Sequence, residues 1–350
     1  MGIPALGLGT MGSTSAQQGN ALKVGVVYVS PVSETGWTRQ HDLGRQAIET
    51  AFPGKVTTTA IANVFSTQDT ERVMRELAEQ GHGLIFGTSF SHMTPIVKVA
   101  RDFPHVKFEH CSGLQHAANL GTFEARYYEG GFLSGVAAGA MTKSNVIGFV
   151  GGFPVPDVVA TVNAILLGAR SVNPKTICRV VWLNSWYDPG KEQEAATALM
   201  AAGADVLVSM TDTAATAVAA ESRGKWSIGY ASDFRKFAPK GQLTSFTLDW
   251  SSIYVEAARA VLEKRWVSRA RWEGIQPGIV KMAPWNPAIP SSVLATVRAN
   301  EAAFQAGTLQ PFTGPINDHT GKPRVARGQT LASDDLRKMN WLVEGVQGTI

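Results

Sequence analysis

Seven side chains could recognise a small ligand, because each lies at or after the carboxyl end of a predicted strand. They are Trp37, Phe90, Glu124, Phe153, Trp186, Asp212 and Asp233. Aromatic faces can hold a flat ring between them, and carboxylates accept hydrogen bonds from exocyclic amines and ring N–H groups. If the chain folds into two lobes, aromatic residues contributed by both lobes would also couple ligand binding to closure of the lobes. These residues therefore predict a binding site for a planar ligand that carries N–H donors.

Most of these residues also have a structural interpretation. Trp37 could pack on its own helix, and Phe153 could belong to the core. Glu124 could cap the helix that follows it or pair with the next arginine. Asp212 is well placed to cap a helix of its own, and Asp233 could complete a turn. The turn-forming residues after Trp186 favour an exposed, functional position for that side chain.

Enzyme signatures are missing from the sequence. It contains no nucleophile elbow, no phosphate-binding P-loop and no HExxH zinc motif. Residues 7–12 have the spacing of a dinucleotide-binding loop, but they precede the first predicted strand, where such a loop does not function. The sequence thus favours a binding protein over an enzyme, and neither a cofactor nor a metal is expected.

The composition is that of a globular protein with large cores. Of its 350 residues, 44% are apolar and 17% are charged, and the net charge is +4. Lysine and arginine are scattered, so no nucleic-acid footprint is expected. Cys111 and Cys178 are too few for a disulfide framework, and the sequence leaves open whether they pair.

Strand-like and helix-like segments alternate along the chain, which predicts βαβ units and mainly parallel sheets. In the stretch 24–45 an apolar strand leads through a polar loop, which holds Trp37, into a helix. The predicted strands are 23–29, 56–64, 83–88, 106–111, 119–125, 146–150, 178–183, 206–210, 227–231 and 243–248. The predicted helices are 40–51, 67–80, 94–101, 127–141, 158–172, 191–202, 214–222, 252–264 and 291–305.

Two successive series of these units indicate an α/β protein with two Rossmann-like lobes. We expect one lobe from residues 22–124 plus 250–275 and the other from 125–249 plus 276–350, the end of which is a loop-rich tail. Crossovers are expected near 123–127, 249–251 and 272–278. A ligand would bind in the cleft between the lobes, at the carboxyl ends of the strands.

The first 21 residues read as the remainder of a secretory leader. Residues 2–12 are small and apolar, and small residues at 14 and 16 predict cleavage after Ala16. An ordinary flexible tail is the alternative. No cysteine lies near this position, so a lipid anchor there is not expected.

The chain resembles periplasmic solute-binding proteins of the basic membrane protein (BMP), or PnrA-like, family of ABC importers. The resemblance covers roughly residues 22–310. It rests on VGVVYV with ETGWTRQHDLGR, on YYEGGFLSGVAAG, on VIGFVGG, on SWYDPGKEQEAA, and on GYASD with LTSFTLDW. It implies the type I periplasmic-binding-protein fold, two Rossmann-like lobes with parallel sheets joined by three crossovers. It also implies a purine-type ligand, a membrane permease as partner and a periplasmic location.

The family pattern is only partly kept. The aromatic residue of the first loop is present as Trp37, but the asparagine that follows it in the family is Thr38. In the GVDSD stretch the first aspartate is replaced by Ala231, while the second is kept as Asp233. A glycine-rich loop is replaced by 211–213, which brings Asp212. Because groups that would serve a ribose are lost, the sequence favours adenine or a related nucleobase over a nucleoside.

Two other functions fit parts of this pattern. The sensor domain of a transcription regulator shares the fold, but it would need a DNA-binding helix-turn-helix before residue 22. A nucleoside-processing enzyme could use the carboxylates at the strand ends, but no motif supports it. The expected protein is a monomeric binding protein that presents its closed form to the permease.

Overall fold

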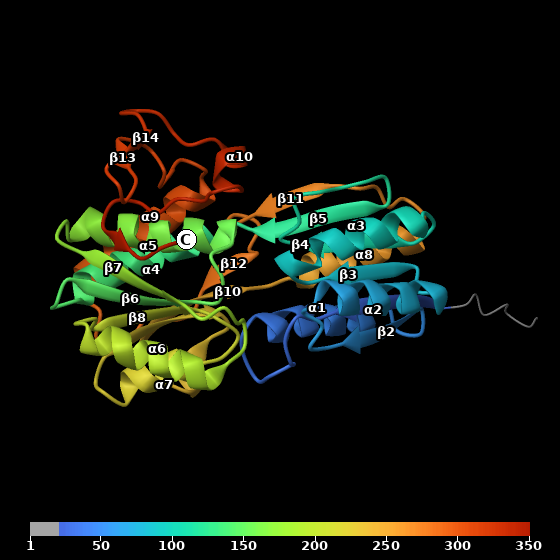
Figure 1. Ribbon diagram of the computed structural model, residues 1–350, viewed down its shortest axis with the longest axis horizontal. Helices are drawn as coiled ribbons and strands as arrows, with labels where there is room; N and C mark the ends of the chain where they lie inside the picture. Colours follow the sequence, from blue (N-terminus) through green and yellow to red (C-terminus); the bar gives the residue numbers. More distant parts are fainter. Residues whose placement is uncertain (1–20) are drawn as a thin grey trace, which may run out of the picture.

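Two β-sheets, each covered by helices on both faces, lie side by side along the longest axis of the molecule (Figure 1). This computed structural model describes residues 21–350, so the expected leader and its cleavage position lie outside the described residues. No helix in the described part of the chain is long and apolar enough to cross a membrane.

The N-terminal lobe is built on a six-stranded sheet in which every strand pair is parallel, in the order β11-β5-β4-β3-β1-β2. Its strands are β1 (Leu22–Val27), β2 (Val56–Ile61), β3 (Leu84–Gly87), β4 (Lys107–Cys111), β5 (Leu120–Ala125) and β11 (Ala270–Glu273). Its helices are α1 (Trp37–Ala51), α2 (Thr67–Glu79), α3 (Met93–Asp102) and α8 (Ser251–Leu262), with the short 3-10 helix η1 (Phe90–His92). Helices α1 and α8 pack together, as do α2 and α3, and separate apolar clusters fill the two faces of the sheet. A strand buried on both faces explains the continuous apolar run of β1.

The C-terminal lobe is built on a seven-stranded sheet in the order β12-β10-β9-β8-β6-β7-β15, where β12 runs antiparallel to β10. Its strands are β6 (Val146–Gly151), β7 (Ile177–Trp182), β8 (Val206–Met210), β9 (Trp226–Ala231), β10 (Gln242–Leu248), β12 (Val280–Met282) and β15 (Val346–Gln347). Its helices are α4 (Tyr127–Met141), α5 (Pro156–Val172), α6 (Pro189–Ala201), α7 (Ala215–Glu221) and α9 (Ser291–Gln305), with the 3-10 helix η2 (Phe234–Lys236).

Helices α4 and α5 touch backbone to backbone. A Cβ atom added at Gly135 would lie 2.1 Å from the carbonyl oxygen of Ile165, and one at Gly139 would lie 2.4 Å from that of Ala169. From the other side, a Cβ at Gly168 would lie 2.1 Å from the carbonyl oxygen of Phe132. Only glycine permits so close an approach, which explains the run of small residues in α4.

The chain passes between the sheets three times: from β5 to α4, from β10 to α8, and from β11 to β12. This confirms the predicted fold class of two Rossmann-like lobes joined by three crossovers. All three connections are short, so they can serve as hinges between the lobes.

The last 45 residues form a tail that packs on the C-terminal lobe (Figure 1). It contains the strand pair β13 (Ile316–Asn317) and β14 (Pro323–Val325), the short helix α10 (Ser333–Leu336) and β15. The expectation of a loop-rich tail missed β15, which pairs in parallel with β7 at the edge of the sheet. Two residues give too short a pattern to detect in a sequence.

Helix α1 begins at Trp37, earlier than the predicted start at Gln40, so Trp37 stands in the first turn of the helix and not in the loop before it. Gly36, at φ 90°, turns the chain directly into the helix, and its carbonyl accepts a hydrogen bond from the Gln40 amide at 3.3 Å. The ring of Trp37 is therefore held by the first turn of a helix.

Candidate ligand-binding site

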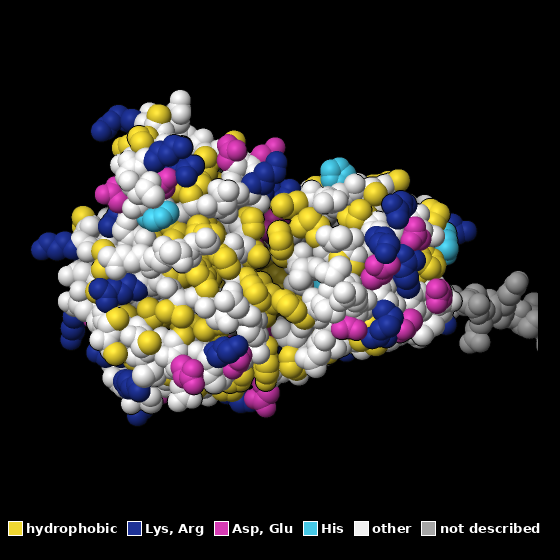
Figure 2. Space-filling view, viewed as in Figure 1, with side chains coloured by type: hydrophobic (Ala, Val, Ile, Leu, Met, Phe, Trp, Pro, Cys, Tyr) yellow, Lys and Arg dark blue, Asp and Glu magenta, His cyan; other side chains and the backbone are white. Residues whose placement is uncertain are grey.

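A cavity lies between the two lobes, at the carboxyl ends of the parallel strands of both sheets. About 450 Å³ of empty space, which includes the solvent-filled opening, lies within it. Its lining residues are Val29, Trp37, Thr88, Ser89, Phe90, Ser112, Val155, Asp157, Val158, Trp186, Met210, Thr211, Asp212 and Tyr230. Figure 2 shows hydrophobic side chains gathered along the junction of the lobes.

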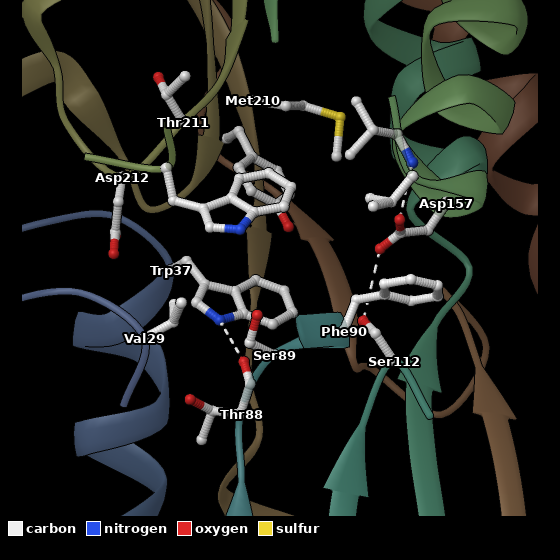
Figure 3. A pocket seen from close by; sticks show the side chains of 14 residues that line it. Val29, Trp37, Thr88, Ser89, Phe90, Ser112, Asp157, Met210, Thr211 and Asp212 are labelled. Carbon is white, nitrogen blue, oxygen red and sulfur yellow. Dashed lines mark hydrogen bonds between the residues drawn. The ribbon is translucent and has the colours of Figure 1, made fainter. Parts of the chain in front are cut away.

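The indole of Trp37 is fixed on several sides. Its Nε1 donates a hydrogen bond to the carbonyl oxygen of Thr88 at 2.9 Å (Figure 3). Its ring lies near-parallel to that of Tyr230, with centroids 6.2 Å apart, and meets the ring of Trp250 edge-on at 5.9 Å. An aromatic face held in this way is prepared to receive a flat ligand.

Trp186 brings a second indole to the cavity from the C-terminal lobe. Its ring packs on Gly152, where an added Cβ would lie 2.3 Å from Cε3 of the indole. Its carbonyl oxygen accepts a hydrogen bond from the Asp212 amide at 2.8 Å, which links the loops after β7 and β8. The two indoles thus come from different lobes.

Asp212 joins the two lobes at one side of the cavity. Its carboxylate, from the loop after β8, accepts a hydrogen bond from the amide of Thr38 at the start of α1, with N–O distances of 3.1 and 3.3 Å. Helix α1 has no capping side chain of its own, so the opposite lobe supplies the cap. Burial raises the pKa of Asp212 to about 7, while the bonds to Thr38 oppose that shift.

Ser232 makes a second direct contact between the lobes. Its hydroxyl oxygen accepts hydrogen bonds from the Gly36 amide at 2.9 Å and from Nε2 of Gln40 at 2.7 Å. At Gly36 the lobes approach so closely that an added Cβ would lie 2.2 Å from Oδ1 of Asp212. The structure therefore shows the lobes in contact around the cavity, as in a closed binding protein.

Asp157 lies on the opposite side of the Trp37 ring from Asp212 (Figure 3). In the first turn of α5, its Oδ1 accepts a hydrogen bond from the Val158 amide at 2.9 Å. Its Oδ2 faces the hydroxyl of Ser112 in the N-terminal lobe at 3.5 Å. Burial raises the pKa of Asp157 to about 6. Two carboxylates thus face the cavity from its two sides.

Four of the seven predicted site residues line this cavity together: Trp37, Phe90, Trp186 and Asp212. Their strands end at the same edge of the two sheets, as the topology requires. The other three predicted residues lie outside the lining.

Glu124, Phe153 and Asp233 have structural partners instead. Glu124 is buried and accepts a hydrogen bond from Nε of Arg337 in the tail at 3.3 Å. Phe153 stacks on Phe65 of the other lobe, with ring centroids 5.7 Å apart and an interplanar angle of 20°. Asp233 caps η2 by accepting the Arg235 amide at 3.0 Å. These three side chains therefore make contacts outside the cavity lining.

Sequence reasoning missed Asp157, Ser112 and Tyr230. Asp157 stands in the first turn of a helix, where an acidic residue is expected for the helix dipole alone. Ser112 immediately follows β4, and this position could have been included by the strand-end rule. Tyr230 is buried within β9 and carries no distinguishing spacing. Its contribution depends on the three-dimensional position of the neighbouring Trp37 ring.

The side chains that line the cavity are mainly apolar or aromatic, and Asp212 and Asp157 place one carboxyl group on each of two sides. No lysine or arginine is among the described residues that line the cavity. Such a site favours an uncharged planar ligand with hydrogen-bond donors on two sides, and it disfavours anions by repulsion. Among residues 21–350, no group of histidine, cysteine, aspartate or glutamate could hold a metal ion.

We expect the protein to lose thermal stability as the pH rises from 6.5 to 8.5. Burial raises the pKa of Glu109 to about 7 and that of Glu192 to about 8. The folded state therefore holds protons that the unfolded chain has already released, and this stabilisation is lost as the pH passes through these values. Differential scanning calorimetry should give a Tm about 5 °C lower at pH 8.5 than at pH 6.5.

The buried histidines explain why the predicted fall in stability begins at pH 6.5. His41, His92 and His110 have lowered pKa values because burial disfavours their charged form, so below pH 6.5 they oppose the effect. The variant Glu192→Gln is the control and should show a smaller fall. A Tm that rises between pH 6.5 and 8.5 would contradict the assignment of these carboxyl groups as protonated.

Comparisons with known proteins agree with the two-lobe fold. The sequence profile of the family described as ABC transporter substrate-binding proteins, PnrA-like, matches residues 21–302. A purine-binding protein of Brucella abortus is 43% identical over 338 residues, which cover 97% of this chain and 96% of that protein. A protein of Haloferax volcanii named as an ABC transporter glucose-binding protein is 34% identical over 337 residues, covering 95% of this chain and 82% of that protein.

A solved structure supports the fold. An ABC transporter solute-binding protein from Aeropyrum pernix K1 superposes with a TM-score of 0.72 at 16% identity, covering 85% of this chain and 93% of that chain. At this identity the similarity speaks for the two-lobe architecture alone.

Proposed function

We propose that this chain, which belongs to the PnrA-like family of ABC transporter substrate-binding proteins, captures adenine or a closely related purine base between its two lobes. The family membership confirms the resemblance inferred from the sequence. Its members are solute-binding proteins and not enzymes, and their type I periplasmic-binding-protein fold is the fold of this chain.

The observation that carries the proposal is the pair of carboxylates on two sides of the Trp37 ring. Adenine is flat and has N–H donors at two separated edges, the exocyclic amine and the imidazole ring. With its ring between Trp37 and Trp186, one edge would meet Asp212 and the other Asp157. Anionic purine derivatives would be repelled by these two acidic side chains, and no lysine or arginine among residues 21–350 lines the cavity to compensate.

The same pair argues for a base over a nucleoside. In a nucleoside the sugar replaces the N–H of the imidazole ring, so one carboxylate would lose its donor. Leaving a buried acceptor unpaired costs about 1–3 kcal/mol. The sequence changes at Thr38 and Ala231 remove groups that could hold a ribose in the family pattern.

Delivery to a membrane permease completes the proposed function. Substrate-binding proteins of ABC importers work outside the cytoplasmic membrane and hand a small molecule to such a permease. We place this protein in the periplasm, where the closed, ligand-bound form would be the one presented.

Isothermal titration calorimetry tests the ligand class. We expect adenine to bind at least about tenfold more tightly than adenosine, because one buried carboxylate stays unpaired with the nucleoside. Glucose should be included because a relative is named for it, and we expect no heat of binding. In the variant Asp157→Asn the preference for the base should shrink.

The opposite ranking has a clear meaning. If adenosine binds and adenine does not, the preference for a base is wrong while the family assignment stands. If only glucose binds, the purine proposal is wrong. The protein should be denatured and refolded before the titration, because this treatment removes any ligand carried through purification.

A further inference from the structure

The tail contacts the N-terminal lobe beside the cavity through one arginine. Nη2 of Arg337 donates to the carbonyl oxygen of Gly113 at 3.1 Å, and its Nε donates to the Glu124 carboxylate at 3.3 Å. Both side chains of this ion pair are largely buried, with 18% of Arg337 and 6% of Glu124 exposed. One guanidinium thus bridges the turn after β4 and the end of β5.

Arg337 itself is held by the C-terminal lobe. The tail residues that follow it are fixed to helix α5 by Asn163, which is fully buried. The Nδ2 of Asn163 donates to the carbonyl oxygen of Trp341 at 2.8 Å, and its Oδ1 accepts the Val343 amide at 2.9 Å. The contact of Arg337 with Gly113 and Glu124 is therefore a contact between the lobes.

The turn that Arg337 holds carries Ser112, which lines the cavity. Ser112 has φ 60°, the left-handed region that a residue with a side chain enters at a cost of about 1 kcal/mol or more. Its amide donates to the carbonyl oxygen of Phe123 at 2.9 Å, and its hydroxyl points to Asp157. Such a conformation persists only where the surroundings impose it.

We propose that Arg337 is a positioning residue for ligand binding, which fixes the turn that carries Ser112 and so directs the Ser112 hydroxyl toward Asp157. The inference deepens the proposed function and rests on it for the choice of ligand. The family profile ends at residue 302, so this residue lies outside the part of the chain that the profile matches. The tail, on this proposal, contributes to the site as well as to stability.

Calorimetric titration with adenine tests the role in binding. We expect Arg337→Gln to bind adenine about tenfold more weakly, which corresponds to the loss of one charge-assisted hydrogen bond. Arg337→Lys keeps the charge but cannot bridge both acceptors, so we expect an intermediate loss. Lys338→Gln is the matched control because it removes an adjacent, exposed positive charge, and its affinity should equal that of the wild type.

A double-mutant cycle separates positioning from general stabilisation. If Arg337 acts through Ser112, the effect of Arg337→Gln should largely vanish in the background Ser112→Ala. An equal effect in both backgrounds would overturn the proposal. A second double variant, Arg337→Gln with Glu124→Gln, is the control for folding. It removes both partners of the ion pair, so no unpaired carboxylate is left buried to destabilise the protein.

Hydrogen exchange gives a measurement that needs no ligand. In the ligand-free protein the amide of Ser112 should exchange faster in Arg337→Gln than in the wild type or Lys338→Gln. If wild-type protein fails to bind adenine, the proposed function is wrong, and the exchange rate still tests the positioning role. Unchanged exchange at Ser112 would overturn that role whichever ligand is bound.

Discussion

Replacing Trp37 with alanine should weaken adenine binding at least about a hundredfold, the effect of losing an aromatic hot spot. The indole lines the cavity and is held by the carbonyl of Thr88 and the ring of Tyr230. Truncation removes the face on which the base would stack, and the neighbouring rings can shift into the space. Titration calorimetry measures the loss, and circular dichroism checks that the variant is folded.

Two further tryptophan variants sharpen this test. Trp37→Phe keeps an aromatic face but cannot donate to Thr88, so we expect a smaller loss of about tenfold. Trp226→Ala is the control, because Trp226 begins β9 at the end of the strand remote from the cavity. If Trp37→Ala binds adenine as tightly as Trp226→Ala does, the ligand does not stack on Trp37.

The second large effect should come from Asp212→Ala, with adenine affinity falling about thirtyfold to a hundredfold. The carboxylate caps helix α1 from the opposite lobe, and a missing cap costs about 0.5–2 kcal/mol. The alanine also removes an acceptor that faces the ligand, which adds about 1 kcal/mol or more. Calorimetry gives the affinity, and small-angle scattering with saturating adenine should show a more open molecule than the wild type.

Comparison variants divide these two contributions. Asp212→Asn keeps an acceptor for the Thr38 amide but no negative charge, so its loss should be smaller than that of the alanine. Asp233→Ala serves as the control, since Asp233 caps η2 outside the cavity, and near-normal affinity is expected. A wild-type affinity in Asp212→Ala would show that neither contact matters for binding.

The sequence was most informative where a physical pattern repeats along the chain. Continuous apolar strands alternating with helices predicted mainly parallel sheets, and the loops after the strands predicted several of the side chains that line the cavity between the lobes. Trp37, Phe90, Trp186 and Asp212 follow strand ends, and all four line this cavity. Their meeting in one cavity follows from the topology.

What the sequence could not predict depends on partners distant in the chain. Glu124 is paired with a residue 213 positions later, and no local pattern marks that contact. Asp212 was expected either to cap a helix of its own lobe or to read a ligand, whereas it caps the helix of the other lobe. Asp157 was missed because an acidic first turn is ordinary in any helix.

The glycine contact between α4 and α5 has a mechanical consequence. Two helices that meet backbone to backbone leave little side-chain space to compress, so a force applied to the C-terminal lobe is transmitted with little internal deformation. The compliant parts of the chain are then the three connections between the sheets. A permease that binds the outer surface of each lobe would therefore rotate the lobes as rigid bodies about these connections. Such a rotation would open the cavity without deforming either lobe.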